Sequence, residues 1–168
     1  CRSLAEEVTA KILNRLNRPV IATSEERLLP GAEDYPHSAA DLKHRCQGIA
    51  DRLGYTPAQI RAAWELHGAR TETALTAHPA SGVLAGVDLP LALARYAIRA
   101  EWARTLDDLV ERRLMLLYHH RLGEETLRQL AQILVEEGTI SPDQAAAQVQ
   151  ACVSRLQTHF GKQVRTNS

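Results

Sequence analysis

The sequence predicts an all-α protein, a compact bundle of about six helices joined by short loops. Alanine, leucine, arginine and glutamate dominate its 168 residues, and β-branched residues are sparse. Side chains of the dominant kinds lose little rotamer freedom on a helical backbone. Apolar residues also recur every three or four positions along most of the chain, whereas no segment shows the period-two alternation of a strand.

The first helix is predicted from Ser3, which with Glu6 forms a capping-box pattern. A single apolar stripe follows on one helical face, made of Leu4, Val8, Ile12 and Leu16. The segment from Pro19 to Tyr35 reads as an extended connector, and we expect its Leu28-Leu29 pair to enter a core.

Three shorter helices should follow the connector. The second begins near Ser38 and ends at Gly54, which supplies a left-handed cap. The third begins at Thr56-Pro57-Ala58-Gln59, with proline at the first helical position, and ends at Gly68. Residues 71–78 are consistent with a short helix before the loop that contains Pro79.

A longer and mostly buried helix is expected after Asp88, which we interpret as its cap. Thr105 with Asp108 indicates a second cap, so this helix should break and restart there before its apolar face ends at Leu117. Two final helices are predicted over residues 124–137 and from Ser141 to Phe160.

These elements suggest three parts. Residues 1–30 form a tail helix and linker, residues 31–161 form the helical domain, and residues 162–168 form a disordered tail. The chain has no initiator methionine and opens directly into a helix at Cys1-Arg2-Ser3. We therefore expect it to be a segment of a larger protein.

The formal net charge is zero, with 20 basic and 20 acidic residues, which argues against a nucleic-acid binder. The three cysteines, Cys1, Cys46 and Cys152, lack CxxC spacing, and the last two fall among helical apolar positions as small core residues. This usage favours a reducing, cytoplasmic compartment. No apolar run approaches the ~20 residues that span a bilayer.

Two local patterns allow other interpretations. Residues 53–60 have the order of a helix-turn-helix unit, so a DNA-binding or protein-interaction module is the alternative function. Its second helix offers Gln59 and Arg61 but also Glu65, which suits DNA poorly. The pair His119-His120 has no third ligand at a recognisable spacing, so a solvated loop is favoured there over a zinc site.

One block carries a family resemblance. It reads Arg95-Tyr96-Ala97, Glu101, Ala103, Thr105-Leu106, Asp108 and Arg112-Arg113. The block resembles the signature of the C-terminal domain of FAD-dependent glycerol-3-phosphate dehydrogenases and the related α-glycerophosphate oxidases. The resemblance extends over nearly the whole chain, to about Gly161.

Shorter motifs agree with this family. Leu29-Pro30-Gly31 resembles the tripeptide that opens the domain, and Leu66-His67-Gly68 resembles a helix end at which His67 replaces the usual tyrosine. Cys1-Arg2 is similar to the end of a Gly-Gly-Lys-x-Thr-Thr-x-Arg segment that lines the flavin. The sequence departs from the family at Ala92-Leu93-Ala94, where many members carry an acidic residue.

The resemblance implies a parent enzyme that oxidises sn-glycerol 3-phosphate to dihydroxyacetone phosphate, passing a hydride to FAD and electrons to quinone. Transfer to oxygen instead would make it an oxidase, and the sequence leaves this open. Of the flavin-binding residues only Arg2 is expected here, so this chain alone should be inert. Its partner is the flavin domain, and the parent is expected in the cytoplasm or peripherally on the inner membrane face.

Five charged residues of the signature are candidates for a functional role: Arg95, Glu101, Asp108, Arg112 and Arg113. We expect them to form a structural ion-pair network, inside the domain or at its seam with the flavin domain, with Asp108 and Arg112 paired at a spacing of four. The alternative hypothesis is that Arg112 or Arg113 attracts the substrate phosphate.

The stripe of the first helix leads to a further expectation. Apolar patches of this size are rarely left bare. The stripe should therefore pack on a second copy in a homodimer or fold back on the bundle, and a monomer with the stripe fully solvated would contradict this.

Overall fold

The computed structural model describes residues 1–20, 24, 27–79 and 82–165. These residues form seven α-helices and no strand, which confirms the all-α prediction. The helices are α1 (Arg2–Arg15), α2 (Ala39–Leu53), α3 (Pro57–His67), α4 (Thr71–Ala77), α5 (Leu91–Ala100), α6 (Glu124–Glu136) and α7 (Pro142–Phe160). Three short turns complete the fold: η1 (Gly68–Arg70) and η3 (Leu116–Tyr118) are 3-10 helical, and η2 (Asp108–Arg113) is π-helical.

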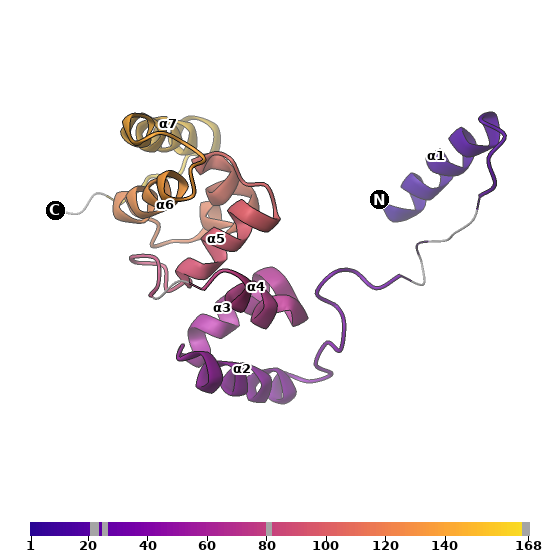
Figure 1. Ribbon diagram of the computed structural model, residues 1–168, viewed down its shortest axis with the longest axis horizontal. Helices are drawn as coiled ribbons and strands as arrows, with labels where there is room; N and C mark the ends of the chain where they lie inside the picture. The colour runs from indigo at the N-terminus through magenta and orange to yellow at the C-terminus, as the bar shows by residue number, and fades with distance from the viewer. Residues whose placement is uncertain (21–23, 25–26, 80–81, 166–168) are drawn as a thin grey trace.

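The bundle has two halves, with α2, α3 and α4 in the lower half and α5, α6 and α7 in the upper half (Figure 1). Successive helices pack on one another from α2 to α7, and α4 meets α5 where the halves join. Helix α1 lies apart from the bundle (Figure 1). One continuous apolar core passes through both halves. Its fully buried members include Ile60, Leu84, Leu93, Leu106, Leu127, Leu134 and Leu156.

Most predicted helix ends are confirmed. Thr56 with Gln59 forms a complete capping box at the start of α3, and at the start of α7 the Ser141 N–H donates to the Gln144 side chain at 2.9 Å. Gly54 ends α2 with φ of 74°, in the left-handed region that glycine adopts without a steric cost. Short-range polar patterns therefore fixed where these helices begin and end.

The start of the first helix is different from the prediction. Helix α1 begins at Arg2, and the Ser3–Glu6 capping box is absent from it. The Glu6 carboxylate instead accepts a hydrogen bond from the backbone N–H of Ser24. A partner 18 residues away has replaced the local one.

The predicted cap at Asp88 is also wrong. Asp88 has a φ of 55° and pairs through its carboxylate with Arg121 at 2.5 Å, while Pro90 precedes the first residue of α5. The interruption near Thr105 is confirmed, since α5 ends at Ala100 and a new turn begins after Thr105.

Two expectations, one about the connector and one about the C-terminal tail, need correction. Leu28 and Leu29 are both exposed and do not enter the core. Residues 162–165, expected to be disordered, dock on the start of α6, where the Glu124 N–H donates to the Arg165 carbonyl at 2.9 Å. Residues 166–168 lie outside the described part. The stripe of α1 is exposed and does not fold back, so its packing on a second copy stays a prediction.

The connector meets the end of α3 through two glycines. The Gly31 carbonyl accepts a hydrogen bond from the Ala69 N–H at 2.9 Å. A Cβ on Gly68 would stand 2.2 Å from the Gly31 carbonyl oxygen, and one on Gly31 would stand 2.5 Å from the His67 oxygen. Glu33 reinforces the junction by accepting from the Gly31 N–H and from Arg70 at 2.7 and 2.8 Å. Neither glycine leaves room for a side chain.

Replacing Gly68 with alanine should therefore be costly. Gly68 has φ 55° and ψ −134°, so the substitution adds backbone strain to the clash, for a loss of about 3 kcal/mol in the free energy of unfolding. Urea denaturation followed by circular dichroism measures it. The matched control is Gly54→Ala. The φ of Gly54 is also positive, but a Cβ added there would meet no atom within 4 Å, so the expected loss of unfolding free energy is about 1–2 kcal/mol. Equal losses for the two variants would contradict the close-packing argument.

Candidate functional site

The signature block begins with an ion-pair cluster between α5 and the end of α6. Arg95 and Arg99 lie four residues apart and reach the same carboxylate, that of Glu137. Both guanidinium groups hydrogen-bond the Glu137 carboxylate, and Arg95 Nη2 also donates to Glu136 Oε2 at 2.7 Å. A further bond joins Arg99 Nη2 to Glu137 Oε1 at 3.0 Å. Arg95 was predicted to belong to such a network, whereas Arg99 and Glu137 were not singled out.

Glu137 is the central group of this cluster, because its side chain is only 4% exposed. Burial by itself would raise the pKa of Glu137, but the hydrogen bonds from Arg99 and Arg95 outweigh it and hold the pKa below its ordinary value. The same contact raises the pKa of Arg99. The carboxylate is therefore charged and paired near neutral pH, which is a structural arrangement rather than that of a general base.

Asp108 organises the turn after α5. Its carboxylate accepts from the backbone N–H groups of Arg104 and Thr105 at 2.9 and 3.0 Å, and the Thr105 hydroxyl accepts from the Asp108 N–H at 3.1 Å. The Arg112 guanidinium also binds this carboxylate, which confirms the predicted pair. Arg113 is exposed and has no ion pair among the described residues.

A third cluster joins the same segment to α7. Arg155 donates to both oxygens of Glu111 at 2.6 and 3.0 Å, and Asp107 lies 3.8 Å away. The arginine also lies over the Phe160 ring, 5.9 Å from its centroid. Sequence reasoning missed this cluster, although the spacing of Asp107 and Glu111 by four was a signal that two acids share one face.

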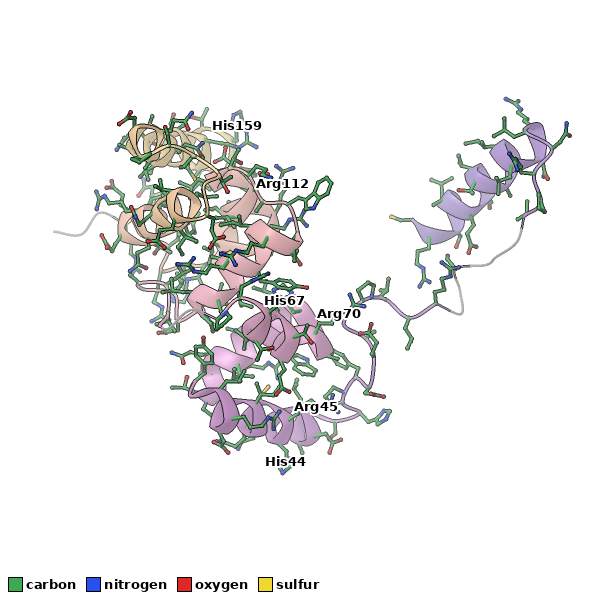
Figure 2. All side chains as sticks on the ribbon, in the orientation of Figure 1. His44, Arg45, His67, Arg70, Arg112 and His159 are labelled. Carbon is green, nitrogen blue, oxygen red and sulfur yellow. The ribbon has the colours of Figure 1, made fainter. Side chains whose placement is uncertain are left out.

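Glu101 lies where the two halves meet. Its carboxylate is 3.8 Å from His67 Nδ1, and the Tyr96 ring contacts His67 edge-on with centroids 5.4 Å apart. His67 lies at the end of α3 (Figure 2), and its side chain is only 9% exposed. Burial lowers the pKa of His67, while Glu101 opposes this shift. Position 67, where the family pattern has tyrosine, is thus a contact between the halves.

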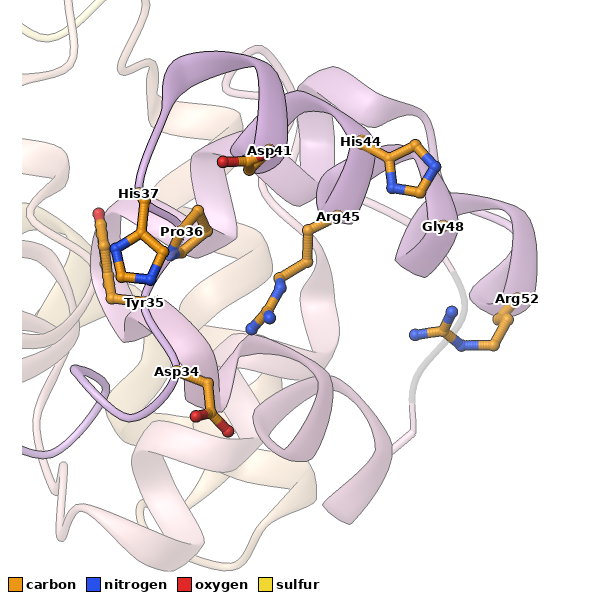
Figure 3. Close-up of a pocket in the computed structure, with 9 residues that line it drawn as sticks. All are labelled: Asp34, Tyr35, Pro36, His37, Asp41, His44, Arg45, Gly48 and Arg52. Carbon is orange, nitrogen blue, oxygen red and sulfur yellow. The ribbon is translucent and has the colours of Figure 1, made fainter.

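The described surface also has an open groove between the connector and α2 (Figure 3). Arg45 extends into it from α2, with its guanidinium 5.8 Å from the centroid of the Trp64 ring. Arg52 at the rim is held by Glu72 through two hydrogen bonds, of 3.0 and 2.8 Å. The groove mixes both signs of charge and brings together no nucleophile with a base, so its geometry points to no reaction.

The other sequence candidates lie in ordinary structural settings. Cys46 and Cys152 are buried, and burial raises the pKa of both thiols, in keeping with core positions. His119 and His120 stack on each other with centroids 5.2 Å apart. No group of three metal-ligating side chains occurs among the described residues.

The helix-turn-helix candidate is real as a structural unit, since α2, a three-residue turn and α3 follow one another. On α3, however, Arg61 pairs with Glu65 at 3.2 Å. The arginine expected to face DNA is thereby partly neutralised by its own helix.

The residues described do not fit a flavin. A dinucleotide needs the glycine-rich turn between a strand and a helix, and these residues form no strand. Arg2, the candidate flavin contact, donates to the carbonyls of Ser24 and Arg27, the latter at 2.8 Å. None of the helices within the described ranges is both long and apolar enough to cross a bilayer.

The Glu137 cluster leads to a pH-dependent prediction. Glu137→Gln should lower the free energy of unfolding by roughly 1–3 kcal/mol at neutral pH, because two arginines lose a buried partner. Because the folded state lowers the pKa of Glu137, its carboxylate stabilises the fold above pH 4.5, the ordinary pKa of glutamate. This stabilisation is lost as the pH falls through the lower pKa of the folded state. The difference between wild type and variant should therefore shrink below about pH 4.5. Urea titrations at several pH values measure it.

The control is Glu136→Gln. Glu136 binds the same Arg95 but is 43% exposed, so its loss should cost at most about 1 kcal/mol. A Glu137→Gln effect no larger than that of the control, or one unchanged by acid, would contradict the central role of Glu137.

A family model for the C-terminal domain of alpha-glycerophosphate oxidase matches residues 22–145. That range holds the Gly31–Gly68 junction and the whole of the Arg95–Arg113 block, but only the first residues of α7. Comparisons with curated proteins and with solved structures gave no match. Because the model covers well over half of the chain, the protein belongs to the family of C-terminal domains of alpha-glycerophosphate oxidase.

Proposed function

We propose that this chain is the C-terminal helical domain of an FAD-dependent enzyme that oxidises sn-glycerol 3-phosphate to dihydroxyacetone phosphate. The family match over residues 22–145 is the observation that carries the proposal. It supports an FAD-dependent oxidoreductase as the parent. The substrate is part of the proposal and follows from the resemblance of the Arg95–Arg113 block.

The role proposed for the chain itself is structural. Two charged residues of the signature are engaged in ties within the domain: Arg95 binds the end of α6, and Asp108 binds the backbone of its own turn. Groups held in this way hold helices together and are not free to act on a substrate. The domain then completes and stabilises the flavin half of the parent, and the flavin chemistry belongs to that other half.

The test compares this chain with the polypeptide that also carries the flavin domain. We expect the longer protein to be yellow and to oxidise glycerol 3-phosphate with a dye as electron acceptor, and this chain to be colourless and inert. Activity with oxygen in place of dye separates an oxidase from a dehydrogenase. A longer protein without flavin and without activity would refute the proposal, and a DNA-binding assay of the α2–α3 unit would then follow.

Arg112 and Arg113 support a second hypothesis, that the arginine pair attracts the substrate phosphate. Both are exposed, and Arg113 has no ion-pair partner in the described ranges. Alanine at both positions in the longer enzyme should then raise the KM for glycerol 3-phosphate and leave kcat unchanged, since a remote charge acts on binding. The matched control is Arg61→Ala, an exposed arginine that also pairs with an acid four residues away. An unchanged KM would refute the hypothesis.

A further inference from the structure

A histidine is buried in the contact between the two halves of the bundle. His67 is the last residue of α3, and its side chain is 9% exposed. The Tyr96 ring of α5 meets the imidazole edge-on, with centroids 5.4 Å apart, and a Glu101 carboxylate oxygen lies 3.8 Å from His67 Nδ1. The imidazole is therefore part of the packing between the end of α3 and α5.

The two ring nitrogens of His67 have different surroundings. Nδ1 faces the Glu101 carboxylate, whereas Nε2 is buried and has no hydrogen-bond partner among the residues that the structure describes. A neutral imidazole can leave one nitrogen as a bare acceptor, but an imidazolium carries an N–H on both nitrogens. A charged N–H buried without an acceptor is costly, because it has lost water and gained no partner. The contact as it stands suits the neutral form.

The charges around this contact do not remove that cost. Glu101, which is 28% exposed, favours the imidazolium, as does the C-terminal end of α3. Burial is the largest influence on the pKa of His67, and it lowers this pKa below the ordinary value of 6.5. Other charged groups of the neighbouring elements meet each other: Glu33 with Arg70 at 2.8 Å, and Arg99 with Glu137 and, at 3.4 Å, with His78.

We propose that His67 is an acid-sensitive latch between the two halves: the neutral imidazole closes the contact of α3 with α5, and its protonation opens that contact. On its other side the chain at His67 is clamped. The Ala69 N–H donates to the Gly31 carbonyl at 2.9 Å, and a Cβ on Gly31 would stand 2.5 Å from the His67 carbonyl oxygen. Nε2 therefore reaches water by movement on the side of Tyr96 and Glu101. The latch belongs to this chain alone and does not depend on the activity proposed for the parent.

The direction of the pH effect follows from the lowered pKa of His67. The opened contact leaves the imidazole in water with the higher, ordinary pKa, so the opened form binds the proton first. The closed contact is therefore fully stable above pH 6.5 and weakens as the pH falls below that value. A single proton changes the opening equilibrium by at most about tenfold for each pH unit.

Backbone hydrogen exchange of this chain, followed by NMR, measures the opening. The amides of Glu101 and Ala103 both donate to the Ala97 carbonyl and lie on the α5 side of the latch. After correction for intrinsic exchange rates, their opening should increase about three- to tenfold between pH 7 and pH 5.5. The Glu124 amide, at the start of α6 and bonded to the Arg165 carbonyl, should show no such increase. In the same samples the His67 ring should titrate below pH 6.5.

Substitutions assign the effect to His67. Neither His67→Gln nor His67→Tyr titrates in this pH range, so each should abolish the pH dependence of opening at Glu101 and Ala103. Glu101→Gln removes the charge that raises the pKa of His67, and it should move the titration of the ring to lower pH. The control is His44→Gln, which replaces an exposed histidine of α2 and should leave the pH profile unchanged.

The outcomes separate the latch from a merely structural histidine. Loss of the pH dependence in either His67 variant that folds supports the latch. An acid response that persists in these variants belongs to another group, such as His119, whose pKa burial also lowers, and would overturn the latch. Opening that is the same at pH 7 and pH 5.5, or a His67 ring that titrates at or above pH 6.5, would overturn it as well.

Discussion

The contact between the backbones of Gly31 and Gly68 sets how the connector, α3 and α4 are joined. The two chains approach so closely that a Cβ on either glycine would overlap a carbonyl of the other segment. Because Gly68 also ends α3, the same contact fixes the position of His67 at the boundary between the two halves of the bundle. His67 in turn contacts the Tyr96 ring of α5 and lies near the carboxylate of Glu101, the residue that follows α5. The motifs Leu29-Pro30-Gly31 and Leu66-His67-Gly68, each a weak signal by itself, thus meet in one close backbone contact.

The signature block has a comparable logic. Its residues do not converge on a single site; they connect one segment of chain to three neighbours. Arg95 binds the end of α6, Glu101 faces α3, and Asp108 holds the turn from which Glu111 reaches α7. Because buried or partly buried charges are costly when unpaired, each tie favours a single arrangement of the helices. The block is therefore a set of contacts between helices, and the family match over residues 22–145 includes all of it.

Large apolar side chains that take no part in these contacts are exposed on the surface. Ala103 is fully buried, whereas Trp102 next to it is 78% exposed. The stripe of α1 is likewise bare in the single chain.

The sequence by itself determined the helical class, the ends of α2, α3, α6 and α7, and the pair Asp108–Arg112. These depend on neighbours within about four residues, which is the range that helical periodicity and capping report. Tertiary structure decided the rest. Glu6 accepts a hydrogen bond from Ser24 and not from the start of its own helix. Asp88 pairs with Arg121, and Arg155 pairs with Glu111, 44 residues before it. Partners so far apart in the chain leave no periodic signal, because their meeting depends on how whole helices pack and not on local backbone preference.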